Sequence, residues 1–153
     1  MGLLAFERGV STLAQQLAFR NELEAVIAAA KANGTVADPL IRQRIVQAEI
    51  GLHLMRYGAL RMLSNSDPAR PDGAALTYKL QWASWRRALG ELAIEVAGQA
   101  GEIADAKTGE FSLLTDVFLS SRADTIYGGT NQIQRNIVAE RALGLPREPR
   151  GQS

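Results

Sequence analysis

Proline is confined to a few positions in this chain, residues 39, 68, 71, 146 and 149. Because proline breaks the interior of a helix, the long stretches between these positions are free to be helical. Within them, apolar residues recur at alternating spacings of four and three, which is typical of a helix that packs along one face. One such row consists of Ile41, Ile45, Ala48, Leu52, Met55, Ala59 and Met62.

Capping signals set the expected helix boundaries. Asp38-Pro39 is a good N-cap followed by proline at the first helical position, and Asn33-Gly34 is a typical stop. No run alternates with the period of a β-strand. We therefore predict an all-α fold, an up-and-down four-helix bundle with an additional C-terminal helix. Residues 1–145 form one helical-bundle domain and 146–153 a polar tail, with helices over about 6–33, 39–64, 74–98, 112–125 and 130–143.

Composition excludes several classes of function. The 17 basic and 16 acidic residues lack the basic excess of a nucleic-acid-binding protein. Without cysteine and with one histidine, His53, the chain has no disulfide, no catalytic triad and no predicted metal site, and His53 is expected to be an ordinary helix residue. No apolar run is long enough to span a membrane, and the N-terminus is not a signal peptide. We expect a cytoplasmic protein, and the arginine-rich, lysine-poor composition suggests a bacterial one.

Two conspicuous pairs have ordinary structural interpretations. Trp82 and Trp85 lie on the apolar row of the third expected helix, so we predict that they pack in the core. Arg86 and Arg87 are interpreted as a solvated helix face rather than an anion site.

The segment from Ser121 to Arg147 reads SRADTIYGGTNQIQRNIVAERALGLPR. A Gly128-Gly129 pair directly before a capped helix leaves backbone N–H groups free and no Cβ atoms in the way. Such a helix start can approach a phosphate or a flat ring closely. The alternative is a plain helix–turn–helix in which glycine only supplies the turn.

This segment resembles the C-terminal signature of the acyl-CoA dehydrogenase family, in which Tyr-x-Gly-Thr is followed by Gln, Ile and Arg on a helix. The pattern of long helices resembles the family's C-terminal α-domain over nearly the whole chain. The matching signature residues are Tyr127, Gly129, Thr130, Gln132, Ile133, Arg135, Glu140, Arg141 and Gly144.

The resemblance implies an FAD-dependent oxidoreductase that converts an acyl-CoA thioester to the trans-2-enoyl-CoA. A glutamate takes the α-proton, a hydride passes from the β-carbon to the flavin, and an electron-transfer flavoprotein accepts the electrons. The family also implies a homo- or hetero-oligomer, a dimer or a tetramer, in which much of the flavin contact comes from a neighbouring subunit. Fatty-acid β-oxidation is the implied setting.

The resemblance also implies where the base lies. One branch of the family carries it directly after the signature tyrosine, where this chain has Gly128. The isovaleryl and long-chain types instead carry it in a Glu-Arg pair on the first helix of the α-domain, and this chain has Glu7-Arg8 there. We predict Glu7 as the base, with Gly128 leaving room for its carboxylate and Arg8 bracing the site. Without the resemblance, Glu7 would be a first-turn glutamate that complements the helix dipole.

The remaining site residues follow residue by residue. Gly129, Thr130 and Gln132 match positions that contact FAD, and Tyr127 would line the acyl pocket together with Gly128. Asn131 and Arg135 are weaker candidates.

The chain departs from the family in two turns and in length. Residues 31–35 lack the family's Arg-x-x-Phe-Gly turn, and residues 98–101 stand where it has a glutamine and a Phe-Gly-Gly turn, so a different partner subunit is one way to complete the flavin site. No N-terminal helical domain or β-barrel domain is contained in these 153 residues. We expect the C-terminal domain of a longer enzyme, inactive in isolation. The alternative is a non-catalytic helical assembly module that partners a dehydrogenase subunit.

Overall fold

Helices account for all the regular secondary structure in the part of the chain that the structure describes. The structure is a computed structural model that describes residues 2–64 and 73–147, with side chains from residue 14 onward in those ranges. The elements are α1 (Gly2–Ala32), η1 (Thr35–Ala37), α2 (Pro39–Ser64), α3 (Gly73–Ala97), η2 (Gly98–Glu102), α4 (Leu113–Asp124) and α5 (Asn131–Arg141). The all-α prediction is confirmed.

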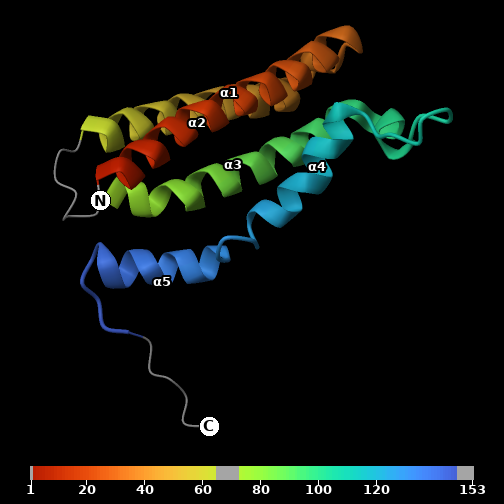
Figure 1. Cartoon of the computed structure of the whole chain (residues 1–153). Helices are drawn as coiled ribbons and strands as arrows, with labels where there is room; N and C mark the ends of the chain where they lie inside the picture. The colour runs from red at the N-terminus through yellow and green to blue at the C-terminus, as the bar shows by residue number, and fades with distance from the viewer. Residues whose placement is uncertain (1, 65–72, 148–153) are drawn as a thin grey trace.

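The three long helices α1, α2 and α3 lie side by side and alternate in direction (Figure 1). Helix α4 packs on α3 and also contacts α1, which completes a four-helix bundle, and α5 then runs back along α3. Because the chain reverses twice between α1 and α3, these two helices are parallel. Phe19 accordingly lies against Trp82, and one turn further Glu22 meets Arg86. The predicted up-and-down bundle with an additional C-terminal helix is confirmed.

Local sequence signals set the helix boundaries as expected. The Asp38 carboxylate accepts a hydrogen bond from the Leu40 N–H at 2.8 Å, which caps α2. Ser112 caps α4 by accepting from the Thr115 N–H at 3.3 Å. Gly34, with φ of 81°, adopts the left-handed conformation just after α1, as the Asn33-Gly34 signal predicts.

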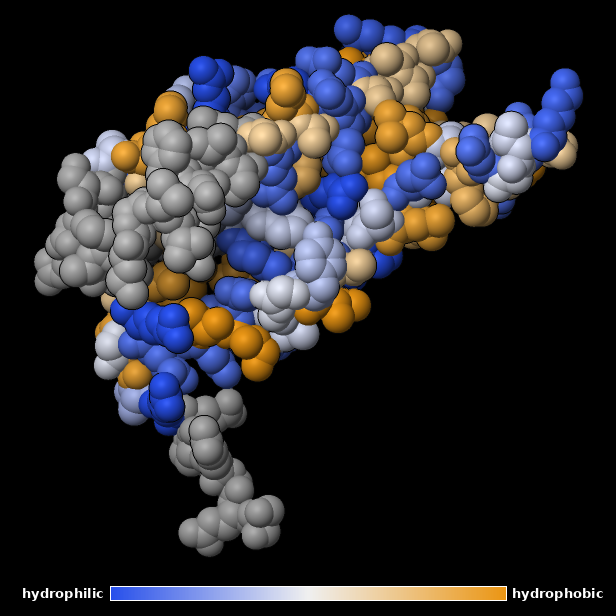
Figure 2. Space-filling model, viewed as in Figure 1, coloured by the Kyte–Doolittle hydropathy of each residue, from blue (hydrophilic) through white to orange (hydrophobic). Residues whose placement is uncertain are grey.

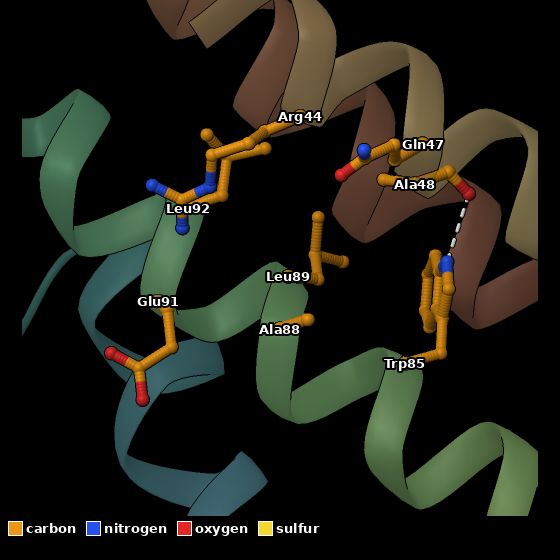
Figure 3. Close-up of a pocket in the computed structure, with 8 residues that line it drawn as sticks. All are labelled: Arg44, Gln47, Ala48, Trp85, Ala88, Leu89, Glu91 and Leu92. Carbon is orange, nitrogen blue, oxygen red and sulfur yellow. Dashed lines mark hydrogen bonds between the residues drawn. The ribbon is translucent and has the colours of Figure 1, made fainter. Parts of the chain in front are cut away.

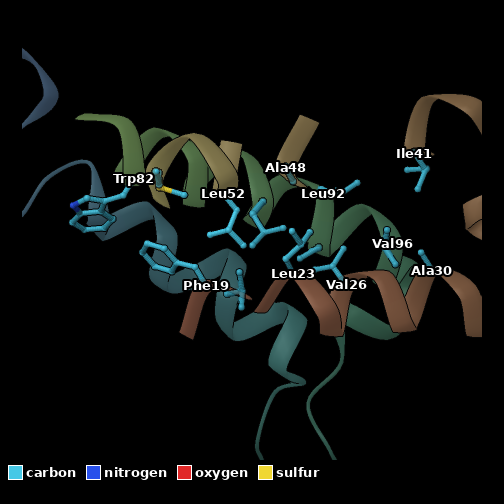
Figure 4. Packing of buried hydrophobic residues seen from close by; sticks show 14 of the residues in the cluster. Phe19, Leu23, Val26, Ala30, Ile41, Ala48, Leu52, Trp82, Leu92 and Val96 are labelled. Atoms are coloured by element: carbon cyan, nitrogen blue, oxygen red, sulfur yellow. The ribbon is translucent and has the colours of Figure 1, made fainter. Parts of the chain in front are cut away.

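The core is a continuous apolar cluster between α1, α2, α3 and α4 (Figure 4). Phe19 contacts both tryptophans, with ring centroids 6.0 Å from Trp82 and 5.3 Å from Trp85. The indole N–H of Trp85 donates to the Ala48 carbonyl at 2.8 Å, so its one polar atom has a partner. The prediction that this tryptophan pair packs in the core is confirmed. The buried apolar members are Phe19, Leu23, Val26, Ala30, Ile41, Ala48, Leu52, Met55, Trp82, Ala83, Leu89, Leu92, Ala93, Val96 and Val117.

Some apolar rows face outward instead. The four-and-three spacing predicts two apolar rows on α1, one of Phe6, Val10, Leu13 and Leu17 and one of Phe19, Leu23, Val26 and Ala30. The second row is buried in the core, whereas Leu17 of the first row is 65% exposed and its other members lie outside the described side chains. Apolar residues also reach the surface over α5, among polar ones (Figure 2). Helix α2 carries an exposed set that we call the α2 apolar row, Val46, Ile50, Leu54, Tyr57 and Leu60.

A glycine brings α4 close to α3. A Cβ atom at Gly90 would lie 2.5 Å from the Ser121 hydroxyl and 3.0 Å from the Phe118 Cα. Any larger residue would therefore push α4 away. This close packing fixes the end of α4, from which the next loop begins.

Candidate functional site

The Tyr-Gly-Gly-Thr sequence forms the tight connection between α4 and α5. Gly128 and Gly129 have φ angles of 64° and 96°, in the left-handed region that glycine favours. Thr130 then caps α5, its hydroxyl oxygen accepting from the Ile133 N–H at 3.3 Å. The predicted glycine turn before a capped helix is confirmed. We refer to residues 125–130 as the signature loop.

Side chains hold the carbonyl groups of the signature loop. The Lys79 ammonium donates to the carbonyl of Asp124 at 2.7 Å and to that of Gly129 at 3.0 Å. The Gln134 amide donates to the Gly128 carbonyl at 2.8 Å. The backbone N–H groups of residues 128–132, by contrast, donate to no other described residue. The carbonyl groups of Gly128 and Gly129 are thus occupied by side chains, whereas the adjoining run of N–H groups donates to no other described residue.

Tyr127 is anchored at its phenol but not enclosed. Its hydroxyl donates to the Asp124 carboxylate at 2.7 Å, and its ring lies 6.4 Å from that of Trp82. Burial of the phenol, and then the Asp124 carboxylate that accepts its proton, raise the pKa of Tyr127. The residue is still 54% exposed, so part of its side chain remains accessible to a ligand.

A buried ionic network lies directly beneath the loop. Asp124 is only 1% exposed, and its carboxylate accepts from Arg86 at 2.8 Å. Arg86 also donates from two nitrogens to Glu22 on α1, at 2.7 and 3.0 Å. The hydrogen bond to Glu22 raises the pKa of Arg86 above its usual range, so the guanidinium stays charged.

The interpretation of the Arg86-Arg87 pair as a solvated face is wrong for Arg86. Only Arg87 is exposed, whereas the Arg86 side chain retains 16% exposure between three helices. The available signal was position, because Arg86 falls on the same helix face as Trp82 and Leu89. A charge inside an apolar row requires a buried partner, and Asp124 and Glu22 provide it.

Lys79 completes the polar surroundings of the loop. Its ammonium lies 5.6 Å from the centre of the Trp82 ring and 5.7 Å from that of Tyr127. Burial lowers the pKa of Lys79, and the nearby Asp124 carboxylate opposes that change. Sequence reasoning did not single out Lys79, because an isolated lysine on a helix resembles any solvent-facing one.

The structure brings together part of the predicted site. Tyr127, Gly128, Gly129 and Thr130 lie in one loop, and the exposed Gln132 follows in the first turn of α5. Glu7 and Arg8 fall on the helical backbone of α1, but their side chains lie outside the described residues. The role of Glu7 therefore stays a prediction.

The first turn of α5 suits an acceptor-rich ring such as a flavin. Its free N–H groups are donors, and the Thr130 hydroxyl still has a hydrogen to donate while its oxygen serves as the cap. Among the described residues, the buried side-chain oxygen of Asn131 has no hydrogen-bond partner, so one acceptor there is unsatisfied. Gly129 has no side chain to cover this point. A Cβ there would lie 2.8 Å from the Gln134 amide nitrogen, which is too close unless Gln134 moves.

Two surface hollows lie away from the signature loop. A pocket of about 220 Å³ between α2 and α3 has an apolar floor and is edged by Arg44 and Glu91 (Figure 3). It includes none of the signature residues. A more open groove runs between α5 and the adjoining ends of α2 and α3.

The described residues contain neither a cluster of metal ligands nor a membrane-spanning helix. Within the described ranges, no three acidic or histidine side chains gather to hold a metal ion. His53 is exposed and lies 3.2 Å from Glu49, one turn earlier on the same helix. Over the same ranges, no helix has the length and apolar character required to cross a bilayer.

Comparison with known proteins identifies the family. Residues 1–143 match the model of the acyl-CoA dehydrogenase C-terminal domain. Acyl-CoA dehydrogenase IpdE1 of Mycolicibacterium smegmatis is 50% identical over 151 residues, which are 99% of this chain and 37% of the relative. IpdE1 of Mycobacterium tuberculosis is 48% identical, again over 99% of this chain and over 38% of the relative. The chain thus spans less than two fifths of these relatives.

A solved structure shares the fold. It is a variant of the Tcur3481-Tcur3483 steroid ACAD, with a TM-score of 0.75 and 24% identity, over 95% of this chain and 39% of that one. Together with the family match, this confirms the resemblance that the signature residues indicated. The chain belongs to the acyl-CoA dehydrogenase family and corresponds to its C-terminal helical domain.

Proposed function

We propose that this chain is the C-terminal domain of an FAD-dependent enzyme that oxidises the Cα–Cβ bond of an acyl-CoA thioester to the trans-2-enoyl-CoA. The observation that carries the proposal is the signature loop, in which the carbonyls of Gly128 and Gly129 accept hydrogen bonds from side chains while the N–H groups of residues 128–130 donate to no other described residue. The loop lies in a chain that is 50% identical over 151 residues to the acyl-CoA dehydrogenase IpdE1 of Mycolicibacterium smegmatis.

The free N–H groups suit the chemistry of the α-proton. Removing a proton next to a thioester moves negative charge onto the carbonyl oxygen, so donors fixed at that oxygen lower the barrier. The N–H groups of Gly128 and Gly129, which donate to no other described residue, are donors of this kind. Tyr127, which is 54% exposed, would line the acyl pocket beside them.

Glu7 is the proposed base. A general base must come within hydrogen-bond reach of the proton that it takes, and it then holds that proton on its carboxylate. Gly128 occupies the position where other branches of the family carry this carboxylate, so it leaves the space open. Arg8 is proposed to brace the site from the neighbouring position.

FAD is the proposed cofactor, as is general for the family. When bound, it supplies the hydride acceptor. Gly129, Thr130 and Gln132 would hold it through the free donors at the start of α5, where Gln132 is exposed. A neighbouring subunit would share this flavin.

We propose that the whole enzyme adds an N-terminal helical domain and a β-barrel domain to the bundle of residues 1–145. It would act in the bacterial cytoplasm, in fatty-acid β-oxidation or a related breakdown of acyl chains, and would pass electrons to an electron-transfer flavoprotein. Proteins of this family are oligomeric, and the α2 apolar row offers a contact for a dimer or tetramer. That row also favours the second candidate function, a non-catalytic assembly module beside a dehydrogenase subunit.

Substitution of Glu7 tests the catalytic proposal in the flavin-loaded protein that carries this chain. Glu7→Gln should abolish bleaching of the flavin by acyl-CoA while leaving the flavin content unchanged, because only the base is lost. Glu24→Gln is the matched control, since Glu24 is an exposed glutamate on the same helix. Near-native bleaching in Glu7→Gln would show that Glu7 is not the base. No bleaching in the unaltered protein by any acyl-CoA would favour the assembly module.

A further inference from the structure

The ends of the signature loop are joined by one side chain. The Lys79 ammonium reaches the carbonyl of Asp124, the last residue of α4, and that of Gly129, directly before the cap of α5. Both distances, 2.7 and 3.0 Å, are those of good hydrogen bonds. Lys79 thus links the end of α4 to the start of α5 across the signature loop.

The loop needs such a bridge because its own sequence gives it little stiffness. Two consecutive glycines have more conformational freedom to lose than any other pair of residues. Both adopt positive φ angles, and a Cβ at Gly128 would lie 3.9 Å from the Lys79 side chain, so the lysine runs along the turn. The position of the loop therefore depends on groups outside it.

Lys79 is itself held in place from several sides. The Trp82 and Tyr127 rings each lie within 6 Å of its ammonium group. Tyr127 is fixed by Asp124, which in turn is fixed by Arg86 and, through it, by Glu22. The position of the ammonium group is thus determined by contacts with other protein groups rather than by solvent.

The orientation of the peptide groups in the loop follows from this arrangement. Lys79 and Gln134 take up the carbonyl groups, and the N–H groups of Gly128 and Gly129 remain free. Rotation of the peptide groups would bring carbonyl oxygens to the surface, where they would repel the oxygens of a flavin or a thioester.

We propose that Lys79 is a positioning residue that clamps the signature loop so that the free N–H groups of Gly128, Gly129 and Thr130 face the bound thioester and flavin. The inference rests on the proposed function, because it names what those groups are aligned to bind. Lys79 touches neither substrate nor cofactor in this proposal. It acts through the backbone of the loop.

Hydrogen exchange of the purified chain tests the clamp without any cofactor. Lys79→Met removes the donors and keeps the aliphatic length, Lys79→Arg keeps charge and donors, and Lys107→Met is the control at an exposed lysine. The amides to follow are the bonded ones of residues 126, 127, 133 and 134. A hydrogen bond from a charged group is strong enough for its loss to speed local opening by about tenfold or more.

We expect that acceleration in Lys79→Met alone, with the core amides of α3 unchanged and at least partial recovery in Lys79→Arg. Unchanged loop amides would overturn the clamp. Equal acceleration in loop and core would reveal a merely structural role and would also overturn it.

FAD titration tests the functional half in the protein that carries this chain. Lys79→Met should raise the Kd for FAD by about tenfold, and Lys79→Arg should restore most of the affinity. A loosened loop with unchanged FAD affinity would overturn the proposal that the clamp serves the flavin. Failure of the proposed function would look different, because the unaltered protein would then bind no FAD while the exchange results stood.

Discussion

Removing the Arg86 charge should destabilise the fold far more than removing an exposed arginine. Arg86→Met keeps an unbranched aliphatic stem but removes the guanidinium group, whose carbon lies 6.0 Å from the centre of the Phe19 ring. It deletes the 2.8 Å hydrogen bond to Asp124, the three hydrogen bonds to Glu22 at 2.7, 3.0 and 3.2 Å, and the 3.0 Å hydrogen bond to Ser120. The loss is therefore electrostatic rather than a loss of volume.

Burial of the partners sets the magnitude. Asp124 is 1% exposed, so without Arg86 its carboxylate keeps the Tyr127 hydroxyl as its side-chain donor and cannot turn to water. Breaking a buried pair by removing one partner costs about 3–5 kcal/mol, against about 0–1 kcal/mol for an exposed pair. Because Tyr127 still donates, we expect about 3 kcal/mol for Arg86→Met.

Urea unfolding of the chain, followed by circular dichroism, measures this difference. Arg44→Met is the matched control, because Arg44 pairs with Glu95 at side-chain exposures of 34% and 52%. The double variant Arg86→Met/Asp124→Asn no longer carries the unpaired Asp124 charge. Its loss of stability should therefore be smaller than the summed losses of the two single variants by more than about 1 kcal/mol. If Arg86→Met costs no more than Arg44→Met, the buried network does not stabilise the fold as argued.

Two further predictions concern the loop and the surface of the bundle. Because the pKa of Tyr127 is raised, the folded state keeps the phenol proton near pH 10.0, where the unfolded state loses it. The contribution of Tyr127 to stability therefore falls as pH rises through that region. Absorbance titration of tyrosinate should show a lower pKa for Tyr127 in Asp124→Asn. Ile50→Glu, at a 53% exposed site on the α2 apolar row, should weaken self-association in sedimentation without loss of helicity, whereas Leu40→Glu, 72% exposed on the same helix, should not.

The fold could be predicted because each of its determinants is local. Asp38-Pro39 marks the start of α2 whichever helix α2 packs against, and the four-and-three spacing along α2 identifies its buried face, which includes Ile41, Leu52 and Met55. Such signals need no knowledge of the partner helix. Leu17 is the exception, because two apolar rows competed for one core and spacing alone does not rank them.

The surroundings of the loop could not be predicted in the same way. Glu22, Arg86 and Asp124 come from three helices, and no spacing along the chain relates them. Each alone is an ordinary charged residue in a helix. Only the parallel register of α1 and α3, and the close approach of α4 at Gly90, bring their charges together.

The same separation explains what the Gly-Gly sequence means. By itself, a pair of glycines specifies flexibility, and a flexible loop cannot hold donors in a fixed direction. In this chain the direction comes from Lys79 and Gln134, which bind the loop's carbonyl groups, and from Asp124, which binds Tyr127. The signature segment therefore names the family, whereas residues up to 50 positions away determine the shape in which the segment would meet its ligand.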